Sequence, residues 1–409
     1  MSRLAPLASP SFRRLFASRT LSVVGTGMAP VGLAFAVLQA TGSTSDLGFA
    51  LASRELPLLL VLPLAGALAD RLPRERVVVA ADLLAALGQA VSAALVLVGG
   101  AGLAPLLVAQ AVSGVAVALA FPALSGLLPQ TVAGDLRREA GALLGLTRNS
   151  GLIAGAALGG LLAAVAGPGW ALAGDALSYL ASAAVLLGIR LSAPEPGEGG
   201  SVLRQLREGW REFVGHPWLW PVVVQFTLVV GLGVTALQVY GAVVSRSHYG
   251  GPAAFGLLAA CQGAGQLLGG VVVLHRQPRR PLVTGLLGIL AATPVPLALA
   301  LLAPLPLVLA LAVVLGVGLE TFDVLWVTAL STHVRPEALS RVSSFDALGS
   351  LALAPLGFAL MGVLGGALGT QGVLLLGAGA IAVPTLVVLC LPAIRGLRAA
   401  GVGPAASNT

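Results

Sequence analysis

Long apolar runs fill almost the whole of this 409-residue chain, and they limit its fold more than any other feature of the sequence. A helix needs about 20 consecutive apolar residues to cross the hydrocarbon core of a bilayer. Charged residues make up only 10% of the chain, whereas a soluble domain carries about 25%, so lipid has to solvate the apolar surface. We therefore predict an all-α integral membrane protein. The twelve expected transmembrane helices cover residues 15–40, 47–69, 77–99, 103–131, 141–166, 170–190, 217–245, 253–274, 281–302, 305–331, 342–365 and 371–394.

The arginines predict how the chain is oriented in the membrane. All 23 basic residues are arginine, and most of them fall in alternate connections or near the two termini. Only Arg246 falls on the opposite side. Because basic residues are retained on the cytoplasmic side, we expect a multi-pass protein of the cell (inner or plasma) membrane with both termini in the cytoplasm. The same asymmetry accounts for the net charge of +7 without a nucleic-acid partner.

The longest polar connection divides the chain into two pseudo-symmetric six-helix halves. A weak repeat supports this division, because Arg71-Leu-Pro-Arg74 has a counterpart in Arg276-Gln-Pro-Arg279 at the same place in the second half. The end of the connection, around Trp210 and Phe213, has the apolar spacing of an amphipathic helix on the cytoplasmic membrane surface. The predicted parts are an N-terminal half over 1–190, a linker over 191–216, a C-terminal half over 217–396 and a cytoplasmic tail over 397–409.

The run Gly66-Ala-Leu-Ala-Asp70-Arg71-Leu-Pro-Arg74-Glu-Arg76 follows the second expected helix. It resembles the loop motif that the major facilitator superfamily carries between spans two and three, although Pro replaces the usual Gly and a Glu interrupts the basic run. The resemblance extends over essentially the whole chain and implies two halves that rock around a central cavity. It also implies a cytoplasmic gate, and Gly66 is expected to let helices two and three approach closely. The expected gate residues are Gly66, Asp70, Arg71, Arg74, Arg76 and Asp82. The alternative is that these arginines only determine topology.

Glycines recur along the fifth expected helix, at Gly151, Gly155, Gly159 and Gly160. Small residues at this spacing make a flat face for close helix packing, which is the alternative to a functional role. The run also resembles the antiporter motif of the superfamily, with Ala156 where Pro is usual, and this implies a face that seals the periplasmic side. The run over 340–362 and the Arg-Glu-Leu-Pro that begins at Arg54 resemble the branch of drug, siderophore and macrolide exporters.

Charged residues inside expected helices are the candidate transport residues, because a charge at mid-bilayer costs at least about 2.5–3.5 kcal/mol. Glu320 and Asp323 share one helical face at i and i+3. Two nearby carboxylates repel each other, so such a pair can bind and release a proton, and Trp326 lies within one turn to contact an apolar substrate. The alternative is a static network with partners on neighbouring helices.

Glu55 and Arg148 are the second candidates for this role, with Arg148 placed either to neutralise an acid or to attract an anionic group of the substrate. Four other charged residues lie nearer the ends of their helices, where we expect water to reach them. These four are Arg19, Asp82, Asp175 and Asp346. Weaker cavity candidates are Thr26, Gln39, Gln110, Ser113, Phe121, Gln225, Gln238 and Tyr240, which can equally be interhelical hydrogen-bonding groups.

The sequence lacks the motifs of other functional classes. It has no Walker motif for ATP, no nucleophile elbow and no histidines at the spacing of metal ligands, so we expect neither an enzyme nor a cofactor or metal. The prediction is a monomeric secondary transporter that exports an amphipathic small molecule, such as an antibiotic, a siderophore or another secondary metabolite, in exchange for protons. The alternatives are an importer with the same fold and a non-transporting membrane sensor or assembly partner.

Overall fold

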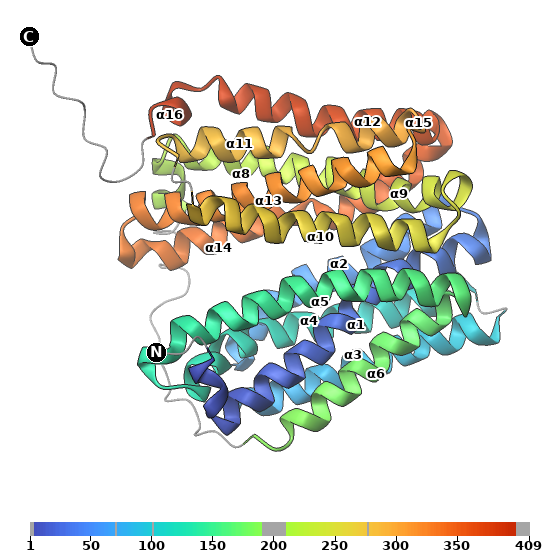
Figure 1. Ribbon diagram of the computed structural model, residues 1–409, viewed down its shortest axis with the longest axis horizontal. Helices are drawn as coiled ribbons and strands as arrows, with labels where there is room; N and C mark the ends of the chain where they lie inside the picture. Colours follow the sequence, from blue (N-terminus) through green and yellow to red (C-terminus); the bar gives the residue numbers. More distant parts are fainter. Residues whose placement is uncertain (1–3, 70–71, 100–101, 190–209, 276–277, 398–409) are drawn as a thin grey trace, which may run out of the picture. The chain divides into compact units, whose positions relative to one another are not determined.

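The computed structural model describes residues 4–69, 72–99, 102–189, 210–275 and 278–397 (Figure 1). All elements in these ranges are helical, which confirms the predicted all-α class. The first group of helices is α1 (Pro10–Thr41), α2 (Thr44–Ala69), α3 (Arg74–Val98), α4 (Leu103–Thr131), α5 (Arg137–Val165) and α6 (Pro168–Leu186). The second group is α8 (Leu219–Leu228), α9 (Thr235–His248), α10 (Pro252–His275), α11 (Pro281–Leu290), α12 (Pro294–Ala300), α13 (Leu305–His333), α14 (Pro336–Ala352), α15 (Ala354–Leu389) and α16 (Pro392–Arg395).

Ten helices of the described part are long and apolar enough to cross a membrane, when α8 is counted together with α9 and α11 together with α12. The helix α2 covers the second expected span. Inside α15 the backbone of Gly369 adopts a left-handed φ of 67°, which breaks the helix into two. The part before Gly369, together with α14, covers the eleventh expected span, and the part after it covers the twelfth. The predicted set of twelve spans is thus recovered.

Local sequence explains how the first helix begins and ends. The hydroxyl of Ser9 accepts a hydrogen bond from the backbone N–H of Phe12, and Pro10 occupies the first helical position, where its missing N–H costs nothing. The helix ends at Gly42, which takes the left-handed conformation that favours glycine at a helix C-terminus. The 32 residues between these signals are long enough to cross the bilayer with some tilt.

The chain divides into two compact units, which we call the first and second units. The first unit comprises Met1–Glu198, Val239–Ala260 and Phe358–Ala367. The second unit comprises Gly199–Gln238, Cys261–Gly357 and Leu368–Thr409. The helices α9, α10 and α15 therefore each contribute residues to both units. The division of the sequence into two six-helix halves remains a prediction.

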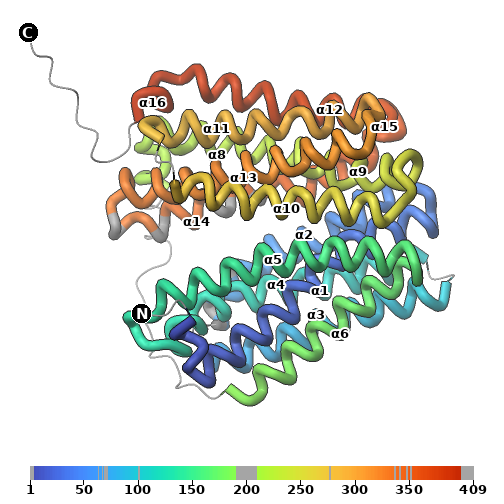
Figure 2. Tube along the Cα trace, in the orientation of Figure 1, coloured from blue at the N-terminus to red at the C-terminus, as the bar shows by residue number. Residues whose placement is uncertain are grey.

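In the first unit, α1 packs against α5 and α6, α2 packs against α4, and α3 packs against α4 and α6 (Figure 2). Glycines allow these close approaches. A Cβ at Gly88 would lie 2.7 Å from the carbonyl oxygen of Ala109, so α3 and α4 touch backbone to backbone. A Cβ at Gly114 would collide with the carbonyl oxygen of Arg54, so α2 packs directly against α4 at this position. The side chain of Arg54 lines a cavity of the first unit.

In the second unit, glycines allow α13 to pack closely against α10 and α11. A Cβ at Gly265 of α10 would lie 2.9 Å from the carbonyl carbon of Val313, and one at Gly288 of α11 would lie 2.6 Å from the carbonyl oxygen of Gly318. Between α8 and α9 the helix widens into a π-helical segment, η3 (Val229–Val234). Such segments often occur at functional sites, and the turn of α8 just before η3 lines one of the cavities described next.

Candidate functional site

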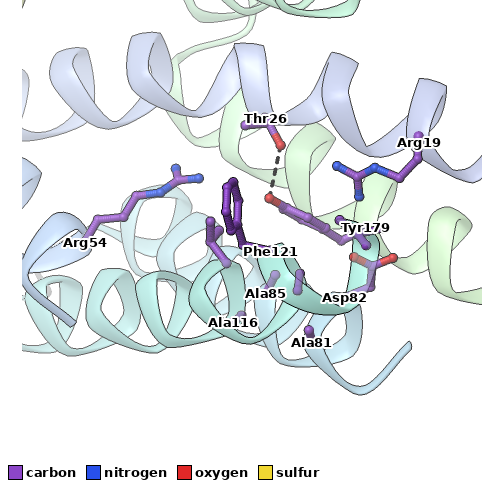
Figure 3. Close-up of a pocket in the computed structure, with 12 residues that line it drawn as sticks. Arg19, Thr26, Arg54, Ala81, Asp82, Ala85, Ala116, Phe121 and Tyr179 are labelled. Atoms are coloured by element: carbon purple, nitrogen blue, oxygen red, sulfur yellow. Dashed lines mark hydrogen bonds between the residues drawn. The ribbon is translucent and has the colours of Figure 1, made fainter. Parts of the chain in front are cut away.

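The first unit contains a cavity of about 160 Å³ between α1, α2, α3, α4 and α6 (Figure 3). Its wall is mostly apolar, with small side chains from α3 and α4 and the ring of Phe121, which is 64% exposed. Polar groups reach it from three other helices. The lining residues are Arg19, Thr26, Arg54, Ala81, Asp82, Ala85, Ala116, Val117, Ala120, Phe121, Leu124 and Tyr179.

Two hydroxyl groups at the cavity have fixed hydrogen-bonding roles. The hydroxyl of Thr26 donates to the carbonyl oxygen of Ser22 at 2.8 Å, and it lies 3.0 Å from the hydroxyl of Tyr179. Because the single proton of Thr26 is used by Ser22, Tyr179 has to donate to Thr26. The remaining lone pairs of Tyr179 are then available as acceptors at the cavity wall.

Asp82 is held at the cavity by a chain of hydroxyl groups. Ser182 of α6 donates to Oδ2 of Asp82 at 2.5 Å, and the hydroxyl of Ser18 lies 2.7 Å from that of Ser182. Asp82 is only 2% exposed. Contrary to expectation, water therefore reaches little of this residue. Its partner Ser182 lies on α6, and its assignment to the gate motif remains a prediction.

Arg19 of α1 and Arg54 of α2 both extend into the cavity, one from each end, with Phe121 and Tyr179 lying between them (Figure 3). Neither guanidinium forms a hydrogen bond or an ion pair with any other residue in the described part of the chain. Asp82 is within electrostatic range of Arg19, and Asp175 within range of Arg54. Ten N–H donors, five from each arginine, thus remain available.

Asp175 lies behind the cavity wall on α6 and is completely buried. The expectation that water reaches it is wrong, because Gly25 of α1 lets the helix backbone close over this carboxyl group. A Cβ at Gly25 would lie 2.7 Å from Oδ1 of Asp175. Neither carboxyl oxygen has a hydrogen-bond partner of normal geometry among the described residues, and Nε2 of the neighbouring Gln89 also has none.

The second unit contains a cavity of similar volume, about 160 Å³, with aromatic and acidic side chains. Phe226 stacks on Phe322 with ring centroids 5.1 Å apart, and Phe322 stacks on Trp326 at 6.0 Å. Oδ2 of Asp346 accepts a hydrogen bond of 2.9 Å from the indole nitrogen of Trp326. The lining residues are Val222, Val223, Phe226, Phe322, Asp323, Trp326, Asp346 and Ser350.

The structure separates Glu320 from this cavity. Asp323 lines it beside Trp326, and it is close enough to Asp346 for their charges to repel. Glu320 lies against α10 instead, where a Cβ at Gly269 would be 3.0 Å from its own Cβ. The carboxyl group that shares the cavity with Asp323 therefore comes from α14, and not from the same helix.

The two secondary candidates also lie outside the lining of both cavities. Arg148 is exposed on α5. Glu55 is partly exposed on α2 and lies in electrostatic range of its neighbour Arg54. Among the weaker candidates, Thr26 and Phe121 line the first cavity. Gln110 and Gln225 serve as interhelical hydrogen-bonding groups, to Ser92 at 3.0 Å and to Thr385 at 2.8 Å.

The predicted gate motif is only partly described, because Asp70 and Arg71 lie outside the described residues. Nη1 of Arg74 donates a 2.7 Å hydrogen bond to the carbonyl oxygen of Gly126, so it ties the start of α3 to α4. Arg76 is exposed. No described atom lies within 4 Å of a Cβ added at Gly66, and its expected role in the close approach of two helices remains a prediction.

The glycine face of α5 packs closely against α1. A Cβ at Gly151 would lie 2.9 Å from Cγ1 of Val23, and one at Gly159 would lie 2.7 Å from Cα of Met28. One at Gly155 would collide with the carbonyl oxygen of Val24. Gly160 turns instead toward α10, where its Cβ would meet the carbonyl oxygen of Pro252 at 2.9 Å within the first unit. The sealing role of this face remains a prediction.

Sequence reasoning missed Tyr179, and it placed Arg19 and Asp346 among groups of lesser interest. A charged residue within a predicted span was the available signal for both Arg19 and Asp346. For Tyr179, the signal was its spacing of four residues from Asp175 on one helix, which places both on the same face. In the described part of the chain, no group of three or more His, Cys, Asp or Glu residues could hold a metal ion.

Comparisons with known proteins address the fold and the family. The family model described as Major Facilitator Superfamily matches residues 15–295. A D-xylose-proton symporter aligns with 94% of this chain and 99% of its own at a TM-score of 0.73 and 14% identity. The nucleoside transporter NupG aligns with 93% and 98% at 0.73 and 13% identity. A bacterial homolog of the human lysosomal transporter Spinster, inward-facing and unoccupied, aligns with 93% of each chain at 0.69 and 18% identity. Such identities show the fold alone, and no curated protein matches the sequence.

Proposed function

Because the chain belongs to the major facilitator superfamily, we propose that it exports an amphipathic small molecule in exchange for protons by alternating access. Membership of this family and the fold of its structural neighbours identify a multi-pass membrane transporter rather than an enzyme. The direction of transport, the coupling ion and the class of substrate are the proposed parts. Antibiotics, siderophores and other secondary metabolites are the substrates that its likeness to drug, siderophore and macrolide exporters favours.

The observation that carries the proposal is the meeting of Asp323 and Asp346 in the aromatic cavity of the second unit. Two carboxylates repel when they share a cavity inside the membrane, and a proton on either of them relieves that repulsion. A charged residue in a membrane helix is costly and is generally found where function requires it. A pair of carboxyl groups in an accessible cavity therefore supplies a site at which a proton can bind on one side of the membrane and leave on the other.

The aromatic residues around this pair support the same assignment. Trp326 is 6% exposed, and its indole N–H fixes the position of Asp346, while Ser350 lies 3.4 Å from the other carboxyl oxygen. Phe226 and Phe322 form an apolar wall on the same cavity. Such a wall keeps the local dielectric constant low, which strengthens the electrostatic coupling between the two carboxyl groups.

Two other features support export by alternating access. The tight glycine face on α5 supports a seal of the antiporter type, because helices that meet backbone to backbone exclude water between them. The hydrogen bond from Arg74 to the carbonyl oxygen of Gly126 supports a role for this motif at the start of α3, where the proposed cytoplasmic gate lies. Both roles are proposals. Both predict that the substrate moves out of the cell when protons move in.

The first test is a screen for the substrate. Everted membrane vesicles from cells that produce the full chain are energised, and proton movement is followed by fluorescence as each compound of a library is added. Release of protons with one class of compound supports proton antiport and names that class. A labelled form of that compound is then offered to intact cells and to everted vesicles. Uptake into intact cells, rather than into everted vesicles, would reverse the proposed direction of transport.

The second test uses that compound in proteoliposomes. We expect Asp323→Asn and Asp346→Asn each to abolish export driven by a pH gradient while leaving counterflow, which exchanges labelled for unlabelled compound without a gradient. Glu320→Gln removes the acid that lies one turn away on α13 but outside the cavity. Loss of coupling with Glu320→Gln and its retention in both aspartate variants would overturn the assignment to this cavity.

A further inference from the structure

We propose that the cavity of the first unit binds an organic anion through Arg19 and Arg54. The inference rests on the proposed transport function and deepens it, because it assigns a charge and a size to the substrate group that enters this cavity. It concerns the first unit alone, whereas the proposed proton site lies in the second.

The first observation is that the two arginines lack hydrogen-bond acceptors among the residues that the structure describes. An arginine within a membrane helix is costly unless it pairs with another group or faces a water-filled cavity. Both guanidinium groups face the cavity, and neither forms an ion pair or a hydrogen bond with another residue of the described ranges. An oxyanion that enters the cavity would supply the acceptors that these donors lack.

The arrangement of the two side chains is the second observation. The guanidinium group is a planar fork that binds a carboxylate or phosphate with two parallel hydrogen bonds. Arg19 and Arg54 reach the cavity from opposite ends, and the ring of Phe121 and the phenol of Tyr179 lie between them (Figure 3). A ligand that satisfies both arginines therefore carries oxygen acceptors at its two ends and an apolar body in the middle.

The volume and the lining of the cavity limit the size of the apolar middle part of the ligand. An apolar cavity of about 150 Å³ accepts a benzene ring, and this cavity measures about 160 Å³. Its floor consists of small residues, Ala81, Ala85 and Ala116, and Phe121 presents an exposed ring for stacking. A single aromatic or alicyclic ring matches this volume, and a carboxylate at each end of the ring would face one of the two arginines.

Within the described part of the chain, the nearby acidic residues form no ion pair with the guanidinium group of Arg19 or of Arg54. Asp82 is in electrostatic range of Arg19 but forms no ion pair with it, and its Oδ2 accepts a hydrogen bond from the hydroxyl of Ser182. On the other side, Asp175 and Glu55 are in electrostatic range of Arg54 without forming an ion pair with it. A purely structural role for Arg54, balancing the charge of the buried Asp175, predicts that neutralising Asp175 makes Arg54 dispensable. Binding of an anion predicts that it does not.

The test measures equilibrium binding to the purified full chain in detergent, with no gradient present. The probes are benzene-1,4-dicarboxylate, benzoate, the neutral benzene-1,4-dicarboxamide and benzylamine, measured by calorimetry and by thermal shift. We expect the dicarboxylate to bind most tightly and benzoate more weakly, with neither the diamide nor the amine binding measurably. Arg19→Gln and Arg54→Gln should each weaken dicarboxylate binding about tenfold or more, because each removes charge-assisted hydrogen bonds.

Matched variants distinguish binding from a structural role. Arg138→Gln removes an exposed arginine at the start of α5 and should leave binding unchanged. Arg54→Lys keeps the charge but loses the planar fork, so binding should be weaker than in the native chain and stronger than with Arg54→Gln. Asp175→Asn combined with Arg54→Gln should bind as weakly as Arg54→Gln alone.

Three results would overturn the proposal. These are equal binding of the diamide and the dicarboxylate, binding that survives both arginine substitutions, and recovery of binding in the Arg54→Gln, Asp175→Asn double variant. Absence of binding by all four probes at millimolar concentration would count against it equally. Since the assay needs no gradient, its failure is distinct from failure of the Asp323 and Asp346 variants to alter proton-driven flux.

Discussion

The indole nitrogen of Trp326 on α13 lies 2.9 Å from Oδ2 of Asp346 on α14 and donates a hydrogen bond to it. This bond joins two helices at the wall of the second cavity, and it holds one carboxyl group in place beside Asp323. A neutral donor on a carboxylate also stabilises its charged form. Proton exchange at Asp346 is therefore expected to depend on the position of the indole ring.

Trp326→Phe tests this dependence, because it keeps an aromatic ring and removes the donor. We expect export driven by a pH gradient to fall about tenfold or more while counterflow changes less than twofold, since a hydrogen bond to a charged group contributes about 1.5–3 kcal/mol. Flux in proteoliposomes at several external pH values is the measurement. Equal losses of gradient-driven export and of counterflow would show that Trp326 acts on substrate binding or movement and not on proton exchange.

Gly155→Ala tests the close packing of α5 on α1. A Cβ at Gly155 would lie 2.9 Å from Cα of Gly27 and would collide with the carbonyl oxygen of Val24, so one of the helices has to shift. Overpacking of this kind costs about 1–3 kcal/mol. Thermal unfolding in detergent should therefore show a lower free energy of unfolding for this variant.

The control for that experiment is Gly145→Ala in the same helix. No described atom lies within 4 Å of a Cβ added at Gly145, and alanine favours a helix over glycine by about 1 kcal/mol. This variant should be as stable as the native chain or more stable. If the two alanine variants lose stability alike, helix packing at Gly155 is not the cause.

Ser182→Ala tests the hydroxyl chain that holds Asp82. The substitution removes the only side-chain donor found for Oδ2 of Asp82 in the described residues and leaves a buried carboxyl group unsatisfied. We expect a loss of about 1–3 kcal/mol in the free energy of unfolding. Ser125→Ala is the matched control, because its exposed hydroxyl bonds only to the carbonyl oxygen of Phe121 in its own helix, and a change within about 0.5 kcal/mol is expected there.

Arg74→Gln tests the proposed gate. Loss of the bond to the carbonyl oxygen of Gly126 should slow the conformational cycle, so the maximal rate of transport should fall about tenfold with little change in substrate affinity. Arg76 is exposed, and Arg76→Gln should therefore have a smaller effect. Identical rates in the Arg74 variant and the native protein would leave topology as the only role for this arginine.

The sequence by itself determined the fold class and the number of spans. Each apolar run has to be long enough to cross the hydrocarbon core, and no helix in lipid can leave its backbone unsatisfied, so the positions of the runs follow from hydropathy. The spacing of Gly151, Gly155 and Gly159 likewise indicated a close-packed helix face, because residues four apart lie on one side of a helix. The structure agrees on both points.

Only the tertiary structure decided which charged groups meet. Glu320 and Asp323 are neighbours on α13, yet positions three apart differ by about 60° around the helix axis, and that angle is enough to turn Glu320 toward the glycines of α10 and Asp323 toward Asp346. Arg19 and Arg54 lie on different helices and come together at one cavity through the packing of α1 and α2 around α4 and α6. The rotation of each helix depends on every surface packed against it, and the hydropathy of a single span does not contain that information.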